Sequence, residues 1–416
     1  MRVLIRVLFV ISCAVFIFAN QANVTSKGSL DSLIANLGCN ENVDVSRDYR
    51  YALYEFSITF YKKIAERNDL NFVYSPISIW LMLAGVAEGA DPYTQWQLFN
   101  LLNLPLDPCI RQKYYNLANS RISAADDVNI INNRVLLVDN SVTLNPTWYD
   151  IIRKHSLLTV FTAPLRYNPV GTANEIRWLM SASLPNLNMK GNSVLLDTMD
   201  YSGLWTNAFG DARVERATFY NQVGYPIGSV DMMRVKRRAR MGYVKAIKAK
   251  VLELPVGANG RYRMMLMVFL ETDDVKKAVQ GVTRDHLLEM FENIRESYVP
   301  LELAIPRIML TSEIDVRALL EDLGISSLWN NPAATRYISN PPAMPSSYVQ
   351  RATLTLNNHG VASSPSERDP WYGTPTGLDP IVGADFVANR PFMIGLFDTE
   401  TLSCLIGTAY STPTYT

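Results

Sequence analysis

Few residues of this sequence could perform acid–base or metal chemistry. The histidines are His155, His286 and His359, and no two of them have the spacing of a metal-ligand pair. The motifs GxSxG, HExxH and GxGxxG and the phosphate-binding P-loop are absent from the sequence. A nucleophile and a histidine could still meet after folding, but no pattern indicates such a pair. We therefore expect no enzymatic activity, no metal ion and no cofactor.

A different chemistry is suggested by the stretch LNNHGVASSPSERDP, residues 356–370. It follows a strand-like run, RATLTL, and precedes a proline-rich segment typical of an exposed loop. The small residues after Gly360 could join a sheet as a new strand. Pro365 opposes this because proline has no N–H to donate to a neighbouring strand. Glu367 opposes it because burial of an unpaired carboxylate is costly.

The segment 71–90, NFVYSPISIWLMLAGVAEGA, predicts a strand followed at once by a helix. Ser75 suits the N-cap position, and Pro76 suits the first helical position, where a missing N–H costs nothing. The helix is apolar nearly all round, so it must be buried. A buried helix that begins at a serine indicates a sheet lying over its N-terminus.

Helices are expected mainly in the first half of the chain, one of them at 47–67 with a wide apolar face. Short strands dominate 212–310, and strands return at 385–399 and 402–410. Strands and helices do not alternate regularly. This pattern favours the α+β class with antiparallel or mixed sheets.

Composition excludes some classes of partner. The chain has 416 residues, 48% of them hydrophobic and 19% charged, which is ordinary for a globular protein with a large core. Lys+Arg and Asp+Glu both number 39, so the formal net charge is zero. This balance argues against a general nucleic-acid binder.

The first residues, MRVLIRVLFVISCAVFIFAN, have the pattern of a signal peptide. Two arginines precede an apolar run that is too short to span a bilayer comfortably. We therefore expect residues 1–19 to be a signal peptide, no membrane anchor, and a secreted, extracellular protein. Asn23 begins the glycosylation sequon Asn-Val-Thr, close to the expected mature start.

Secretion permits disulfides. Cys13 would be lost with the signal peptide, and Cys39, Cys109 and Cys404 would remain. Cys404 lies in a strand-like apolar run and is expected to be a buried free thiol. Whether Cys39 and Cys109 form a bridge stays open at this point.

Five blocks of the sequence resemble, in the expected order, the characteristic segments of the serpin family. They are residues 71–98, 195–220 with its Gly203 and Trp205, 249–272, 301–329, and 385–413 with Arg390-Pro391-Phe392. The resemblance covers residues 45–413 and implies a single serpin domain. It also implies three β-sheets, eight or nine helices and an exposed reactive loop near the C-terminus.

Inhibitory serpins trap serine or cysteine proteases. The protease cuts the exposed loop and becomes acylated to it, and the cut loop then inserts as a new central strand of the large sheet. The resemblance therefore implies a secreted serine protease as partner. We expect the protein to be a monomer.

The loop hinge departs from the pattern of inhibitory relatives. Gly360 falls at the position of the family's hinge glycine, and Asn358 and His359 replace the usual acidic pair before it. The hinge continues through Val361, Ala362, Ser363, Ser364 and Pro365. In a strand, Val361, Ser363, Pro365 and Glu367 would share one face.

The scissile bond is not fixed by counting, because the loop is several residues longer than is usual for the family. Counting forward from Gly360 and back from Pro391 gives different positions. The candidate scissile region contains Arg368, Tyr372, Thr374, Leu378 and Pro380.

The resemblance also implies a buried polar network where the central strands of the large sheet separate. Ser75 and Ser78 match the two serines of relatives, whereas Asp197 and Gln350 stand where relatives have asparagine and histidine. A glutamine amide can donate to a carboxylate, so the two substitutions can be compatible. Trp205 is expected at the top of the sheet.

The run RVKRRAR, residues 234–240, has three interpretations. It could bind a sulfated polysaccharide, be a processing site, or be a solvated hairpin edge on which Lys and Arg discourage edge pairing. Its basic residues are Arg234, Lys236, Arg237, Arg238 and Arg240.

The sequence thus predicts a secreted serpin-fold protein that is non-inhibitory or a weak protease trap because of Pro365 and Glu367. The alternative is a functional serine-protease inhibitor that acts by loop cleavage and insertion.

Overall fold

The computed structural model describes residues 42–122, 127–179, 191–206, 209, 212–270, 274–361 and 385–413. The predictions on the signal peptide, Asn23, Cys13 and Cys39 lie outside these residues. The predictions on Ala362, Ser363, Ser364, Pro365, Glu367 and the candidate scissile region also lie outside them. From Val45 onward, the described residues belong to one compact unit.

The helices pack mainly through buried apolar faces. They are α3 (Ser46–Arg67), α4 (Pro76–Ala87), α5 (Pro92–Leu102), α6 (Pro108–Arg121), α7 (Pro146–Lys154), α8 (Pro169–Leu179), α9 (Val275–Gly281), α10 (Arg284–Asn293), α11 (Val316–Asp322), α12 (Ser327–Asn330) and a 3₁₀ turn, η1 (Lys245–Ile247).

The largest sheet has seven strands in the order β1–β19–β18–β10–β9–β8–β11. Their bounds are β1 (Asn71–Tyr74), β19 (Cys404–Tyr410), β18 (Phe392–Asp398), β10 (Tyr262–Phe269), β9 (Ala249–Val256), β8 (Arg240–Val244) and β11 (Arg295–Glu296).

A six-stranded sheet has the order β13–β15–β5–β2–β4, and a short strand, β16, pairs with β5 off this path. The bounds are β13 (Ile308–Asp315), β15 (Pro345–Leu356), β5 (Ser193–Leu204), β2 (Val128–Asp139), β4 (Thr159–Ala163) and β16 (Gly360–Val361).

A four-stranded sheet and a two-stranded ribbon complete the strands of the described residues. The four-stranded sheet contains β17 (Phe386–Val387), β12 (Leu301–Pro306), β7 (Pro226–Arg237) and β6 (Arg213–Tyr220), in that order. The ribbon pairs β14 (Ser339–Asn340) with β3 (Thr143–Leu144).

The predicted α+β class with three sheets is confirmed. The described residues hold ten α-helices, rather than eight or nine. The difference depends on short elements, since α12 is a single turn of four residues.

The segment from β1 to α4 folds as the sequence predicts, with one correction. β1 spans Asn71–Tyr74 and α4 begins at Pro76, as expected, and every residue of α4 is buried. Ser75 occupies the N-cap position, but its hydroxyl does not cap the helix. It donates instead to the carbonyl of Leu405 in β19, at 2.7 Å, because Ser75 is fully buried and this carbonyl lies within its reach.

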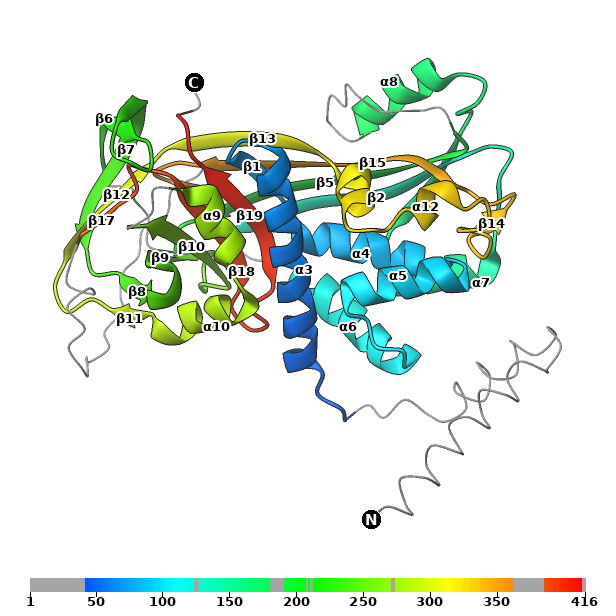
Figure 1. The fold of residues 1–416 in the computed structure, drawn as a ribbon, viewed down its shortest axis with the longest axis horizontal. Coiled ribbons are helices and arrows are strands. Elements are labelled where there is room, and N and C mark those ends of the chain that lie inside the picture. The colour runs from blue at the N-terminus through cyan, green and yellow to red at the C-terminus, as the bar shows by residue number, and fades with distance from the viewer. Residues whose placement is uncertain are drawn as a thin grey trace, which may run out of the picture. The chain divides into compact units, whose positions relative to one another are not determined.

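The six-stranded sheet is covered on both faces. Alternate residues of β5 point to opposite sides: Leu195 and Met199 belong to the main core, and Val194 and Leu196 belong to a smaller cluster with Ile176 of α8. Figure 1 shows α4 and α8 on opposite sides of the long strands β5 and β2. The side of β5 that carries Asp197 therefore faces α4.

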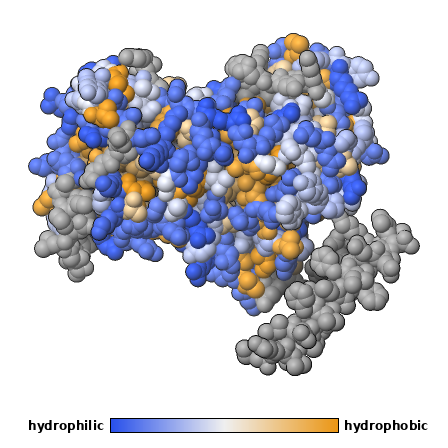
Figure 2. All heavy atoms as spheres, in the orientation of Figure 1, coloured by the Kyte–Doolittle hydropathy of each residue, from blue (hydrophilic) through white to orange (hydrophobic). Residues whose placement is uncertain are grey.

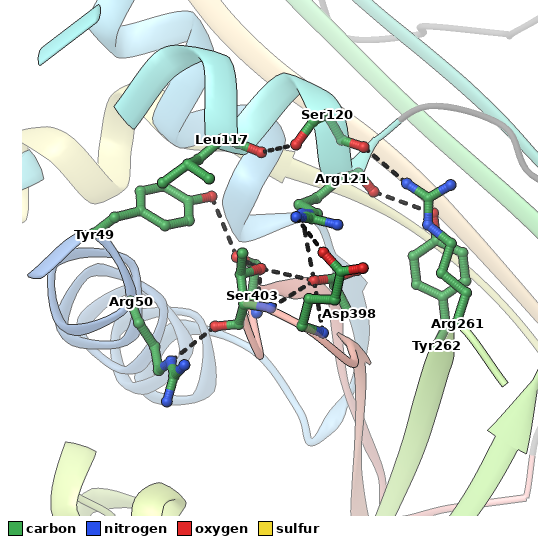
Figure 3. Close-up of polar contacts among 11 residues, drawn as sticks. Tyr49, Arg50, Leu117, Ser120, Arg121, Arg261, Tyr262, Asp398 and Ser403 are labelled. Atoms are coloured by element: carbon green, nitrogen blue, oxygen red, sulfur yellow. Dashed lines mark hydrogen bonds and ion pairs between the residues drawn. The ribbon is translucent and has the colours of Figure 1, made fainter. Parts of the chain in front are cut away.

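A cluster of polar side chains connects α3 and α6 to the turn between β18 and β19 (Figure 3). Asp398 is fully buried and accepts hydrogen bonds from the amide and the hydroxyl of Thr401, both at 2.8 Å. Arg121, at the end of α6, lies 3.6 Å from this carboxylate, and Ser403 donates to the hydroxyl of Tyr49 in α3. The cluster closes the turn and is best explained as structural.

The surface carries several separate apolar patches. Figure 2 shows a mostly hydrophilic face with apolar atoms gathered in patches between polar side chains. Among the described helices, none has the length and apolar character needed to cross a membrane.

Candidate functional site

The structure brings together the four residues of the predicted polar network. Asp197 lies at the middle of β5, 1% exposed, opposite Gln350 of β15 in a parallel pairing. Ser78 of α4 donates to Asp197 Oδ1 at 2.5 Å, and Gln350 Nε2 donates to Asp197 Oδ2 at 2.7 Å. One carboxylate therefore joins β5 to a helix beneath it and to the neighbouring strand.

Gln350 also holds the start of α4. Its Oε1 accepts from the backbone N–H of Ser75 at 2.8 Å, and its Nε2 donates to the carbonyl of Ser75 at 3.0 Å. Ser75 and Gln350 are both fully buried, so the backbone N–H and C=O of Ser75 need partners within the protein. The side-chain amide of Gln350 satisfies both groups, as a neighbouring strand otherwise would. This arrangement explains how Asp197 and Gln350 can together replace the asparagine and histidine of relatives.

Two further residues of this network were not found by sequence reasoning. Asn132 Nδ2 donates to Ser78 Oγ at 2.6 Å, and Arg134 Nη1 donates to Asn132 Oδ1. The sequence did contain a signal for them, because Asn132 and Arg134 are two polar residues, two positions apart, in the run that forms β2. Strand alternation places both on the face of Asp197, because Arg134 pairs with Asp197 directly.

The network is electrostatically unbalanced. Burial raises the pKa of Asp197 to about 6, although the hydrogen bonds from Ser78 and Gln350 and the charge of Arg134 act in the other direction. Burial also lowers the pKa of Arg134 to about 10, which leaves this guanidinium charged at neutral pH. The site therefore holds an aspartate that changes charge in the mildly acidic range.

The predicted hinge forms a hairpin with the end of β15. Asn357 and Gly360 exchange backbone hydrogen bonds, and Asn358 and His359 form the two-residue turn between them. The returning strand, β16, pairs antiparallel with β5, with Gly360 opposite Leu204. The first two hinge residues thus already lie between β5 and β15, at the end of the sheet where those two strands no longer pair.

Gly360 is required by this geometry. Its φ is +134°, and a Cβ atom there would lie 2.5 Å from the carbonyl oxygen of Gly203. The hairpin is also held by Trp205, whose indole N–H donates to the carbonyl of Asn357 at 2.9 Å. The predicted place of Trp205 at the top of the sheet agrees with this contact.

The basic run follows the end of β7 and the turn into β8, and beyond Arg234 it pairs with β12 on one side alone. β7 as a whole lies between β12 and β6, and its pairing with β6 ends at Arg234. Arg234 Nε lies 2.6 Å from Glu215, and Arg240 Nε lies 3.0 Å from Glu253. The guanidinium of Arg237 lies over the ring of Phe209, while Lys236 and Arg238 are exposed.

The histidines hold structural contacts within the described residues. His155 Nδ1 lies 3.1 Å from Asn116 Oδ1, His286 completes the capping box of α10, and His359 lies in the hinge turn. Among the described residues, no group of three His, Cys, Asp or Glu side chains could hold a metal ion.

The two described cysteines differ. Cys404 is a buried free thiol, as predicted, and burial raises its pKa far above the ordinary value. Cys109 is disulfide-bonded. Its suggested partner, Cys39, lies outside the described residues.

Comparison with known proteins places these features in a family. The model of the family described as Serpin (serine protease inhibitor) matches residues 51–413. The chain belongs to the serpin family. A serine protease inhibitor of the rat (Rattus norvegicus) is 23% identical over 363 residues, which cover 83% of this serpin and 84% of that protein.

Solved serpin structures have the same fold. Uncleaved ovalbumin aligns with a TM-score of 0.75 at 20% identity, over 87% of this chain and 99% of that chain. Thyroxine-binding globulin in complex with thyroxine aligns with a TM-score of 0.75 at 15% identity, over 88% of this chain and 99% of that chain. At these identities the likeness shows the fold alone.

Replacement of Asp197 by alanine should lower the free energy of unfolding by about 1–3 kcal/mol at pH 5, because Ser78 and Gln350 would lose a buried partner. The raised pKa of Asp197 means that the wild-type aspartate stabilises the fold most when protonated and less as pH rises through about 6. The loss should therefore be smaller at pH 8. Urea unfolding at both pH values measures it, and equal stability of the two proteins at pH 5 would contradict the network.

Replacement of Gly360 by alanine should expel β16 from the sheet, since the new Cβ would collide with Gly203. Cleavage of the loop by a dilute nonspecific protease should then become faster. Gly224→Ala is the matched control, because Gly224 also has a positive φ, +91°, but nothing lies within 4 Å of its Cβ position. Equal cleavage rates of the two variants would show that the pairing of β16 does not restrain the loop.

Proposed function

We propose that this serpin is a secreted protein, with a signal peptide at residues 1–19 and a serpin domain at 45–413, whose loop begins to insert but does not insert efficiently. It would then be cut by a secreted serine protease rather than trap one. The observation that carries the proposal is the register of β16 against β5 and β15.

That register fixes what further insertion would require. Gly360 is opposite Leu204 on β5 and opposite Asn357 on β15. If the strand continued in this register, each later residue would move one position back along both neighbours. Pro365 would then face Met199 and Ala352, and Glu367 would face Asp197 and Gln350.

Glu367 would meet an unfavourable partner at this position. Residues directly opposite in an antiparallel pair point to the same side of the sheet, and like charges there are destabilising. Asp197 is buried on the side of α4, so the Glu367 carboxylate would enter the same polar network. Insertion would also separate Asp197 from Gln350, so two carboxylates would have to share the donors, Ser78 and Gln350, that in the uncut protein serve Asp197 alone. One of the two carboxyl groups would have to bind a proton or remain uncompensated.

Pro365 adds a second obstacle two residues earlier. A strand inserted between two neighbours uses each of its N–H groups in turn, and proline would leave one carbonyl of β5 or β15 without its donor. Unmet buried carbonyls cost on the order of 1–3 kcal/mol each. The insertion would therefore meet both obstacles within its first half.

The alternative, a functional serine-protease inhibitor, has one observation in its favour. Gly360 and Val361 already pair with β5, so the start of the hinge is able to form a strand. A protease would be held if this partial insertion sufficed, or if the obstacles at Pro365 and Glu367 were relieved.

The thermal stability of the loop-cleaved protein tests this proposal. Cleavage between Tyr372 and Leu378 should leave the melting temperature nearly unchanged, because insertion stops. The double variant Pro365→Ala, Glu367→Ala should gain a large rise on cleavage.

A control pair, Ser364→Ala with Ser366→Ala, changes residues that would face away from the side of Asp197. It should behave like the unmodified chain. A large rise in the unmodified chain after cleavage would instead support the inhibitor.

A second candidate function is transport of an apolar small molecule. A cavity of about 60 Å³ lies between α3, α9, α10 and the seven-stranded sheet. Its walls are almost entirely apolar and include Met265, Met267, Met290 and Met393, whose flexible thioethers can adapt to a ligand. Thyroxine-binding globulin, by its name, shows that the same fold can bind a small molecule.

A cavity of this volume is far too small for thyroxine, so a small apolar molecule such as benzene is the suitable probe. Titration with benzene should raise the melting temperature in a saturable manner, and Ile58→Phe, which fills the cavity, should abolish the rise. Equal binding by the variant would exclude the cavity as the site.

We include no sulfated polysaccharide in the proposal. Arg234 and Arg240 are paired with carboxylates of neighbouring strands, and Arg237 lies over Phe209. Two exposed basic side chains, Lys236 and Arg238, are too few for a strong polyanion site.

A further inference from the structure

The network around Asp197 has a property that concerns the uncut protein and does not depend on the proposed function. Asp197 lies where three elements meet, with one oxygen bound to Ser78 of α4 and the other to Gln350 of β15. Separation of β5 from β15 must break the second of these contacts and admit water to the carboxyl group. The free energy of separation therefore includes the change in solvation of Asp197.

The positive charge of Arg134 is linked to Asp197 by a chain of hydrogen bonds rather than by direct contact. Arg134 donates to Asn132, Asn132 donates to Ser78, and Ser78 donates to Asp197, so all three hydrogen bonds point from the guanidinium toward the carboxylate. Arg134 also donates to the carbonyls of Leu157 and Ser156, at 2.7 Å each. Its charge is thus shared with other acceptors, and it compensates Asp197 only in part.

In the network around Asp197, the aspartate is the group that changes its charge near neutral pH. From β2 the charged neighbour is Arg134, and from β15 the titratable neighbour is Tyr348. The pKa of Tyr348 is raised well above its ordinary value by burial, so it remains neutral. The contacts from α4 come from Ser78 and, through Gln350, from Ser75, and neither serine titrates.

We propose that Asp197 makes the separation of β5 from β15 pH-dependent: protonation of this carboxyl group holds the strands together, and its ionisation eases their separation. The closed sheet binds the proton more tightly than the open one, because the open sheet exposes the carboxyl group to water. The stabilisation of the closed sheet is therefore complete below the ordinary aspartate pKa. It is lost as pH rises through about 6, the pKa in the closed sheet.

The size of the effect follows from the difference in the pKa of Asp197 between the closed and the open sheet. The pKa of Asp197 is about 6 in the closed sheet, against a model value of 3.8. A difference of about two pKa units corresponds to a change of up to about 100-fold in the opening equilibrium between acidic and alkaline conditions. The direction is unusual for a structural aspartate, since acid closes this sheet rather than loosening it.

Hydrogen–deuterium exchange of the intact, uncut chain tests the proposal. Between pH 5 and pH 8, protection of the backbone amides of β15 around Gln350, corrected for intrinsic exchange rates, should fall by about 10-fold. Protection of β9 and β10, which lie in another sheet, should not fall. In Asp197→Asn, which has no charge to lose, the protection of β15 should not depend on pH.

A second variant keeps the carboxyl group and removes its counter-charge. Arg134→Gln should raise the midpoint of the pH dependence, because the ionised carboxylate loses compensating charge. The proposal is overturned if protection of β15 in the wild-type chain is independent of pH. It is also overturned if Asp197→Asn retains the wild-type dependence or if Arg134→Gln leaves the midpoint where it was.

Discussion

The carboxylate of Asp197, buried between two strands and a helix, governs how the six-stranded sheet is held together. It fixes the start of α4 through Ser78, and it fixes β15 through Gln350. Gln350 in turn satisfies both backbone groups of Ser75, so the N-terminus of a fully buried helix needs no water. A single buried charge thus defines the point at which the six-stranded sheet must part if any segment is to enter it.

We propose that the same carboxylate limits insertion of the loop. The two-residue strand β16 already occupies the end of the sheet, because β5 extends beyond its pairing with β15 and offers free backbone groups there. Further entry in this register leads toward Asp197, where a second carboxylate would arrive with Glu367. In this proposal, a hinge that begins to insert meets a sheet centre that resists the residues that follow. In our proposal, this combination separates a protease substrate from a protease trap.

Much of the fold could be predicted from the sequence, because local signals and family blocks agreed. Pro76 after a serine marked the start of α4, and the family resemblance placed Asp197 in a buried polar network. The hydrogen-bonding role of Ser75 could not be predicted, since it depends on the carbonyl of Leu405, which comes from a strand 330 residues later. Arg134 and Asn132 were missed for the same reason, because their partners are set by sheet register rather than by any local motif. Charge alone left three interpretations of the basic run open, because the partners of Arg234 and Arg240 depend on the strand order of the sheets.

Whether the loop is cut without trapping the protease can be read from a denaturing gel. The intact protein would be incubated with a trypsin-like and a chymotrypsin-like protease, and the products separated under conditions that keep only covalent links. We expect a serpin shortened by cleavage within its loop and a protease that remains free and active. A stable band at the summed mass of the two proteins, with matching loss of protease activity, would mean that the loop inserts and that this serpin is an inhibitor.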